Sequence, residues 1–152
     1  MDKARDVVNG LKKSYAMALE SVQNYLANSI HLEGPAADRV KKMLENAVAS
    51  ELQHARRLAR RIKILGNRVP GSLELPRDQI FLQPPIDNRD TVTVIRGALT
   101  ATDAAIAQYQ AMIQITEDLD FVTQDLLIEL LTEEQEQKDS LNQLLARISG
   151  AP

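Results

Sequence analysis

The stretch "ELQHARRLARR" (Glu51–Arg61) combines the apolar spacing of a helix with a glutamate and a histidine, two residue types that can bind metals. Glu51 and His54 are three residues apart, so a helix places them one turn apart on the same face. Leu58 follows four residues after His54 and continues that face. A carboxylate and an imidazole at this spacing supply half of a metal site in helical bundles. The stretch therefore predicts a long amphipathic helix whose buried face carries a polar pair.

Apolar residues at alternating spacings of three and four predict four long helices, at about residues 3–33, 36–65, 91–116 and 120–148. Gly66 suits the left-handed position that ends a helix, and Pro35 suits the first turn of the second predicted helix. Polar residues interrupt the buried stripes of the second and fourth predicted helices. These stripes comprise Leu44, Ala47, Glu51, His54, Leu58, Arg61 and Leu65, and Leu127, Leu130, Glu134, Gln137, Leu141, Leu144 and Ile148.

The linker from Gly66 to Asp90 determines the predicted topology, because it is too long for a simple helix hairpin. An extended chain of this length spans up to ~80 Å, whereas a 30-residue helix is only about 45 Å long. The linker can therefore cross the whole bundle and leave the second and third helices parallel. We expect an all-α, single-domain protein over residues 1–152, a four-helix bundle with one long crossover.

Composition excludes several kinds of function. The chain has no cysteine, so it forms no disulfide and performs no thiol catalysis. Its net charge of −3 gives no electrostatic reason to expect a nucleic-acid partner. No apolar run approaches the length that spans a membrane. We expect a cytoplasmic protein with neither a membrane nor a nucleic-acid partner.

Three stretches of the chain resemble the ferritin-like superfamily, closest to its bacterioferritin and Dps-like branch. They are "YLANSIHLEGP" (25–35), "ELQHARRLARRIKILG" (51–66) and "DFVTQDLLIELLTEEQEQKDSL" (120–141). The resemblance covers nearly the whole chain and implies a ferritin-like bundle. Members with a working centre bind two irons between the helices and oxidise Fe(II) with dioxygen or peroxide. Their ligands are one glutamate from each of helices one and three and a Glu-x-x-His from each of helices two and four.

Only part of this ligand set is present here. Glu51 and His54 match the motif of the second helix, and Glu134 matches the glutamate of the fourth. The histidine of the fourth helix is replaced by Gln137, which could add a neutral oxygen. The resemblance therefore implies metal ligands at Glu51, His54, Glu134 and Gln137, and we assign no catalytic residue.

The glutamates expected on the first and third helices are absent. The first-helix position is Ala18, and the third-helix position falls at Ala101 or Thr102. Glu20 lies two residues from Ala18, which is about 200° around a helix, so it should face away from the bundle centre. Asp103 is short and lies off the buried stripe.

The missing carboxylates limit the metal content, because two ferrous ions would bring four positive charges into an apolar bundle. We expect iron or another divalent metal, one ion at most, and no rapid di-iron ferroxidase turnover. Bacterioferritin-like haem binding uses a methionine that is replaced here by Leu52, so no haem is expected.

Two alternatives to a ferritin-like metal protein with an incomplete ligand set remain open. In the first, the chain is a metal-free structural or partner-binding subunit, with protonated His54 paired to Glu51 or Glu134. In the second, a single metal serves a different redox activity. We expect self-association, at least as a dimer, through apolar residues outside the buried stripe of the first helix, such as Leu19, Leu26 and Ile30.

Overall fold

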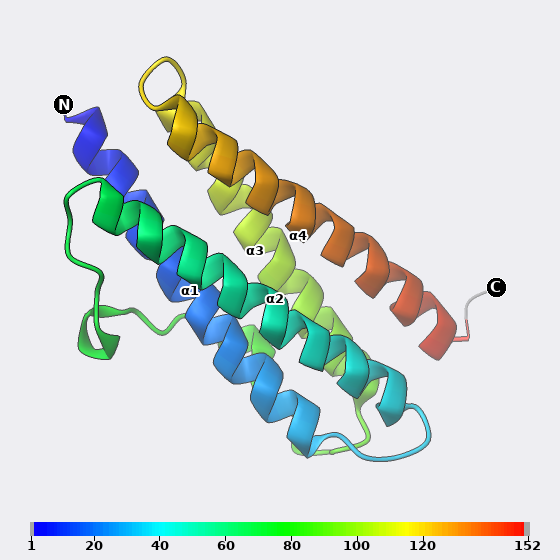
Figure 1. Cartoon of the computed structure of the whole chain (residues 1–152). Coiled ribbons are helices and arrows are strands. Elements are labelled where there is room, and N and C mark those ends of the chain that lie inside the picture. Colours follow the sequence, from blue (N-terminus) through cyan, green and yellow to red (C-terminus); the bar gives the residue numbers. More distant parts are fainter. Residues whose placement is uncertain (1, 151–152) are drawn as a thin grey trace.

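The computed structural model describes residues 2–150 and contains four long α-helices (Figure 1). They are α1 (Lys3–His31), α2 (Ala37–Ile64), α3 (Thr91–Thr116) and α4 (Phe121–Ile148). Two short 3₁₀ turns, η1 (Ser72–Glu74) and η2 (Ile80–Leu82), lie between α2 and α3. Residues 2–150 contain no β-strand. The predicted all-α four-helix bundle is confirmed.

Aspartate side chains begin three of the helices. Asp2, Asp90 and Asp120 each accept a hydrogen bond from a backbone N–H three residues ahead, at the first turns of α1, α3 and α4. The start of α2 has no side-chain cap, and Pro35 lies in the turn before this helix. The predicted place of Pro35 within the first turn is therefore wrong. Gly66 has a φ of +83°, as predicted for the residue that ends α2.

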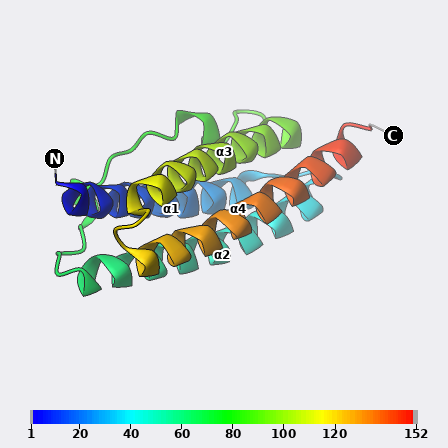
Figure 2. The ribbon, with the colours of Figure 1, turned by 90° about the horizontal axis from the view of Figure 1, so that it is seen from above.

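The segment between α2 and α3 crosses the length of the bundle, so that α2 and α3 run parallel (Figure 1). It passes along the side formed by α1 and α3 (Figure 2). Glu20 of α1 holds it there, because its carboxylate accepts hydrogen bonds from the backbone N–H groups of Asp78 and Gln79, both at 2.9 Å. Asn28 adds a third tie by donating from Nδ2 to the carbonyl of Leu82 at 2.9 Å. The predicted crossover is confirmed, and Glu20 faces this segment.

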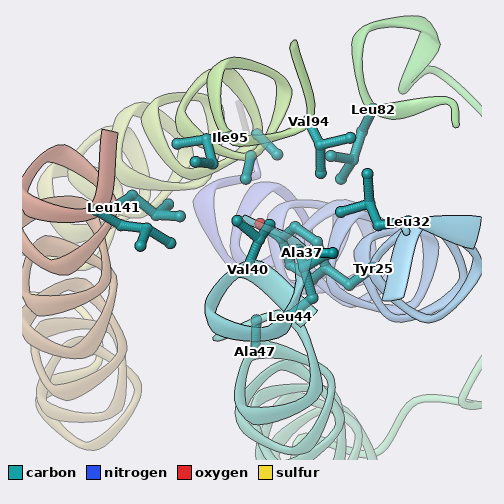
Figure 3. Packing of buried hydrophobic residues seen from close by; sticks show 13 residues of the cluster. Tyr25, Leu32, Ala37, Val40, Leu44, Ala47, Leu82, Val94, Ile95 and Leu141 are labelled. Atoms are coloured by element: carbon teal, nitrogen blue, oxygen red, sulfur yellow. The ribbon is translucent and has the colours of Figure 1, made fainter. Parts of the chain in front are cut away.

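Apolar side chains form two buried clusters. In the first, Leu82 of η2 lies with Leu32 and Val94 where the crossover meets the bundle (Figure 3). The second contains Leu11, Leu58 and other buried side chains from the opposite end of the helices. The two clusters hold both ends of the helices together and leave the middle of the bundle to polar residues.

Gly97 of α3 allows the crossover to approach the helix closely. A Cβ atom at this position would lie 2.4 Å from the backbone oxygen of Phe81. Because this neighbour is backbone, it can move only if η2 moves with it. Gly71 is a useful contrast, since a Cβ atom at that position would have no neighbour within 4 Å.

We expect Gly97→Ala to lower the free energy of unfolding by about 1–3 kcal/mol, because overpacking outweighs the better helix propensity of alanine. Gly71→Ala is the matched control and should leave stability nearly unchanged. Urea denaturation monitored by circular dichroism measures both. A Gly97→Ala variant as stable as the unmodified protein would contradict the close approach.

Candidate metal centre

The middle of the bundle brings Glu51 and His54 of α2 together with Glu134 of α4. All three are buried, and each offers one ligand atom within 4.8 Å of the others. The helical period accounts for this convergence, because Glu51 and His54 occupy one face of α2 and that face packs toward α4. The structure thus places these three predicted residues side by side.

The three side chains are close without satisfying one another's hydrogen bonds. His54 Nδ1 lies 3.3 Å from Glu134 Oε1 and 3.6 Å from Glu51 Oε2. Neither nitrogen of His54 nor Oε1 of Glu134 has a hydrogen-bond partner with adequate geometry in residues 2–150. Buried polar atoms without partners cost free energy. Nitrogen and oxygen atoms that converge in this way without hydrogen-bond partners are suited to bind a divalent cation.

Burial and mutual contact shift the pKa values of the cluster. Burial raises the pKa of Glu134 well above 4.5, and the neighbouring Glu51 carboxylate adds to the shift. For Glu51 burial acts in the same direction, but contact with Glu134 and His54 outweighs it and the pKa is lowered. Burial lowers the pKa of His54, yet Glu134 and Glu51 raise it to about 10. Without a metal, a charged His54 therefore pairs with an ionised Glu51, and burial favours the protonated form of Glu134.

Glu133 is a contact of the site that the sequence did not indicate. Its Oε2 lies 3.2 Å from His54 Nε2 and 3.1 Å from Arg57 Nη1. Arg57 also pairs with Glu129 of α4. The sequence gives only one signal for these contacts: Glu133 directly precedes Glu134, and Arg57 lies one turn after His54. These contacts link the imidazole to the surface of α2 and α4.

Gln137 lies one turn after Glu134 on α4 and is half-buried. It lines a surface depression together with Arg39 and Lys42 of α2. No hydrogen bond joins it to the three clustered residues within the described part of the chain. Its role as a ligand stays a prediction.

A small void lies where carboxylates are missing. Its volume is about 10 Å³, and Ala18, Ala101 and Glu51 are among the residues that line it. A void of this size holds about one water molecule. Thr102 is buried but does not line this void, and its hydroxyl donates to the carbonyl of Ala98 at 2.8 Å. Of the two candidate positions on α3, Ala101 is therefore the one that borders the site.

Glu20 and Asp103, the carboxylates closest in sequence to the missing ligand positions, lie away from the site, as predicted. Glu20 binds the crossover, as described above. Asp103 pairs with Lys138 at 2.8 Å, and its side chain is 55% exposed. Neither residue can complete a second metal site without a rearrangement of its helix.

The chain belongs to the ferritin-like domain family, whose model matches residues 8–151. This confirms the predicted superfamily. No curated protein matches the sequence. No helix in residues 2–150 combines the length and apolar character that a membrane span requires.

Two solved bacterial structures share the fold. A Bacillus anthracis str. Ames structure, described as ferritin-like, diiron-carboxylate proteins, is 18% identical with a TM-score of 0.82, and the match covers 95% of this chain and 99% of that one. The bacterioferritin-related protein from Bacteroides fragilis, described as a dodecameric thioferritin, is 23% identical with a TM-score of 0.83. That match covers 98% of this chain and 89% of the other. At these identities the likeness shows the fold alone.

We expect the metal-free cluster to make stability depend on pH through His54. Its folded pKa of about 10 lies above the reference value of 6.5, so its contribution is complete below pH 6.5 and is lost as the pH rises through about 10. In the presence of a chelator, the stability difference between the unmodified protein and His54→Gln should shrink over this range. Urea denaturation at several pH values measures it, with the exposed Gln53→Ala as control. A difference that stays constant or grows with pH would contradict a charged His54.

We expect restored ligands to rebuild a two-metal site. Ala18→Glu, Ala101→Glu and Gln137→His together should raise iron content from about one to about two ions per chain and accelerate Fe(II) oxidation, because they supply the missing charge and imidazole. Glutamines at positions 18 and 101, combined with Gln137→His, form the matched control of equal size without charge. Elemental analysis and stopped-flow absorbance measure both effects. Equal iron content in the two variants would show that charge does not limit the site.

Proposed function

We propose that this chain is a ferritin-like metal-binding protein that holds one divalent transition metal, iron(II) in the first instance, at Glu51, His54 and Glu134. The observation that carries the proposal is the convergence of three buried ligand atoms within 4.8 Å. His54 and Glu134 also present atoms that have no hydrogen-bond partner among residues 2–150. Carboxylate and imidazole ligands suit iron and its neighbours in the first transition series.

The charge of the cluster sets its capacity. Ionised Glu51 and Glu134 balance one divalent ion, whereas a second ion would leave two uncompensated positive charges in the core. The alanines at positions 18 and 101 offer no ligand atom on the opposite side. Gln137 could add a neutral oxygen if its side chain turned inward.

The residues of the cluster must change protonation to bind the ion. A metal ligand is a neutral imidazole or an ionised carboxylate, so His54 loses its proton on binding and the raised pKa of Glu134 opposes the ionised form that the metal needs. Affinity should therefore rise with pH. Oε2 of Glu133 lies 3.2 Å from Nε2 of His54. A small reorientation of either side chain would let it accept a hydrogen bond from Nε2–H and so fix Nδ1 as the ligand atom. When bound, iron(II) would supply a redox-active Lewis acid in this buried setting.

A metal-free structural role is the second candidate. The raised pKa of His54, about 10, favours it, because a charged imidazole beside one ionised and one protonated carboxyl group leaves the cluster neutral without an ion. In that case the chain would act as a helical subunit of an assembly. Metal content and stability without metal distinguish the two candidates.

Self-association forms part of the proposal. Leu26 and Ile30 of α1 are 52% and 74% exposed, and Leu52 of α2 is 38% exposed. Exposed apolar residues on adjacent helices are typical of a contact surface. The described assembly of the Bacteroides fragilis protein, a dodecamer, supports a homo-oligomer here as well.

We expect protein purified without chelator and supplied with Fe(II) to bind about one ion per chain. His54→Ala and Glu134→Gln should each abolish stoichiometric binding, because the first removes a ligand atom and the second removes half of the negative charge that balances the ion. His31→Ala is the matched control, since His31 bonds the carbonyl of Pro85 at the far end of α1. Elemental analysis after gel filtration measures the content. Unchanged binding in His54→Ala would place the metal elsewhere.

We expect Leu26→Glu to dissociate the assembly into smaller species, because it buries a charge in the proposed contact. Leu73→Glu is the control, since Leu73 is fully exposed in the crossover at 102%. Sedimentation velocity measures the sizes. If the unmodified protein is a monomer at high micromolar concentration, the proposed contact does not exist.

A further inference from the structure

A pocket of about 350 Å³ opens on the molecular surface between α1, α3 and the crossover. Its walls are largely apolar and include Ala16 and Met17 of α1, Phe81 of the crossover and Ala104 of α3. Phe81 is 37% exposed, so part of an aromatic ring is left uncovered there. The volume and the apolar walls are those of a site for a small molecule.

The wall formed by the crossover is held in place by hydrogen bonds within the protein. Besides the two backbone groups bound by Glu20, the side chain of Gln79 donates from Nε2 to Ser21 Oγ at 2.7 Å. Gln79 Oε1 in turn accepts a hydrogen bond from Asn24 Nδ2 at 3.1 Å. These contacts fix the wall without any ligand, so the pocket is preformed.

The floor of the pocket separates it from the metal cluster by a single layer of side chains. Met17, Gln79 and Gln108 line both this pocket and the small void beneath it. That void also borders Glu51 and the two alanines that replace carboxylate ligands. Met17 is unbranched and adapts its shape readily. A molecule in the pocket would therefore lie next to the open side of the cluster.

The charges around the pocket limit what it can hold. Lys13, Glu20 and Asp78 are the charged residues that line it, so it carries no excess of positive charge for an anion. The carboxamide of Gln79 is engaged by Ser21 and Asn24, and Gln108 donates from Nε2 to the carbonyl of Gly10 at 3.3 Å. The carboxamide oxygen of Gln108 can therefore accept one hydrogen bond from a ligand. An uncharged molecule that is mostly apolar fits this lining.

We propose that this pocket binds a small uncharged aromatic or aliphatic molecule with one hydrogen-bonding group, next to the metal ligand Glu51. The proximity to a metal rests on the proposed function, whereas the binding itself does not. The open side of the cluster thus faces a site for an uncharged, mostly apolar ligand. Contact between the two sites is made by Met17, Gln79 and Gln108.

Phenol is a suitable probe because it combines an aromatic ring with one hydroxyl and is uncharged at neutral pH. In metal-free protein with ¹³C-labelled methionine methyl groups, phenol should shift the Met17 signal saturably, with a dissociation constant on the order of 1 mM. Met43 lies between α2 and α4 and serves as an internal control that should not move. No shift of Met17 at about ten times this concentration, or equal shifts of Met17 and Met43, would overturn the proposal.

Two substitutions test the place of binding. Ala104→Phe should fill the pocket and Phe81→Ala should remove its aromatic wall, and each should weaken phenol binding at least about fivefold. Ala111→Phe is the matched control, because Ala111 is exposed on α3 outside the pocket. Circular dichroism verifies the fold of each variant. Binding unchanged in both pocket variants would overturn the assignment.

Protein loaded with Co(II) tests the link to the metal. Phenol should change the visible d–d spectrum of the bound Co(II), and Ala104→Phe should suppress that change. If Co(II) binds and phenol fills the pocket without any spectral change, the link between the two sites is wrong. If Co(II) does not bind to the unmodified protein, the proposed metal function fails, and the titration of the metal-free protein alone decides whether the pocket is a ligand site.

Discussion

The structure depends on the burial of a polar cluster, Glu51, His54 and Glu134, in the middle of a bundle whose ends are apolar. An uncompensated charge in such a place costs several kcal/mol. The cluster is therefore stable only when its charges balance. Protons on His54 and Glu134 can provide this balance, and so can a divalent cation. The apolar clusters on both sides keep α2 and α4 in position and prevent the three side chains from reaching solvent.

This constraint connects the fold to the chemistry. The crossover lets α2 and α3 run parallel, and it engages Glu20, the carboxylate of α1 that lies closest in sequence to the missing ligand at position 18. Small residues on α1 and α3 then leave space on one side of Glu51. The site is consequently asymmetric, with protein ligands from α2 and α4 and an open side toward α1 and α3.

The sequence predicted the elements whose signals are local. Helical spacing indicated the four helices, and the length of the linker indicated the crossover. The same spacing identified Glu51, His54 and Glu134, because polar residues that lie on the apolar face of a helix are buried together with that face. The prediction that Glu20 faces away from the centre was confirmed for the same reason, since its angle around α1 follows from its position in the chain.

The remaining features depend on how separate helices pack. Glu133 reaches His54 only because of the rotation of α4 relative to α2, and the sequence of either helix alone does not contain that angle. Gln79 meets Ser21 across a long separation in the chain. The choice between Ala101 and Thr102 required the shape of the void, which depends on the volumes of all its neighbours.

X-ray absorption at the iron edge of the loaded protein distinguishes a single-metal site from a dinuclear one, because it reports both the ligands and the distance to any second metal. We expect a shell of oxygen and nitrogen neighbours with the scattering of one imidazole and no iron–iron contribution. Paired metals in proteins lie about 3.5–4 Å apart. An iron–iron signal in that range would show a dinuclear centre and contradict the single-metal site.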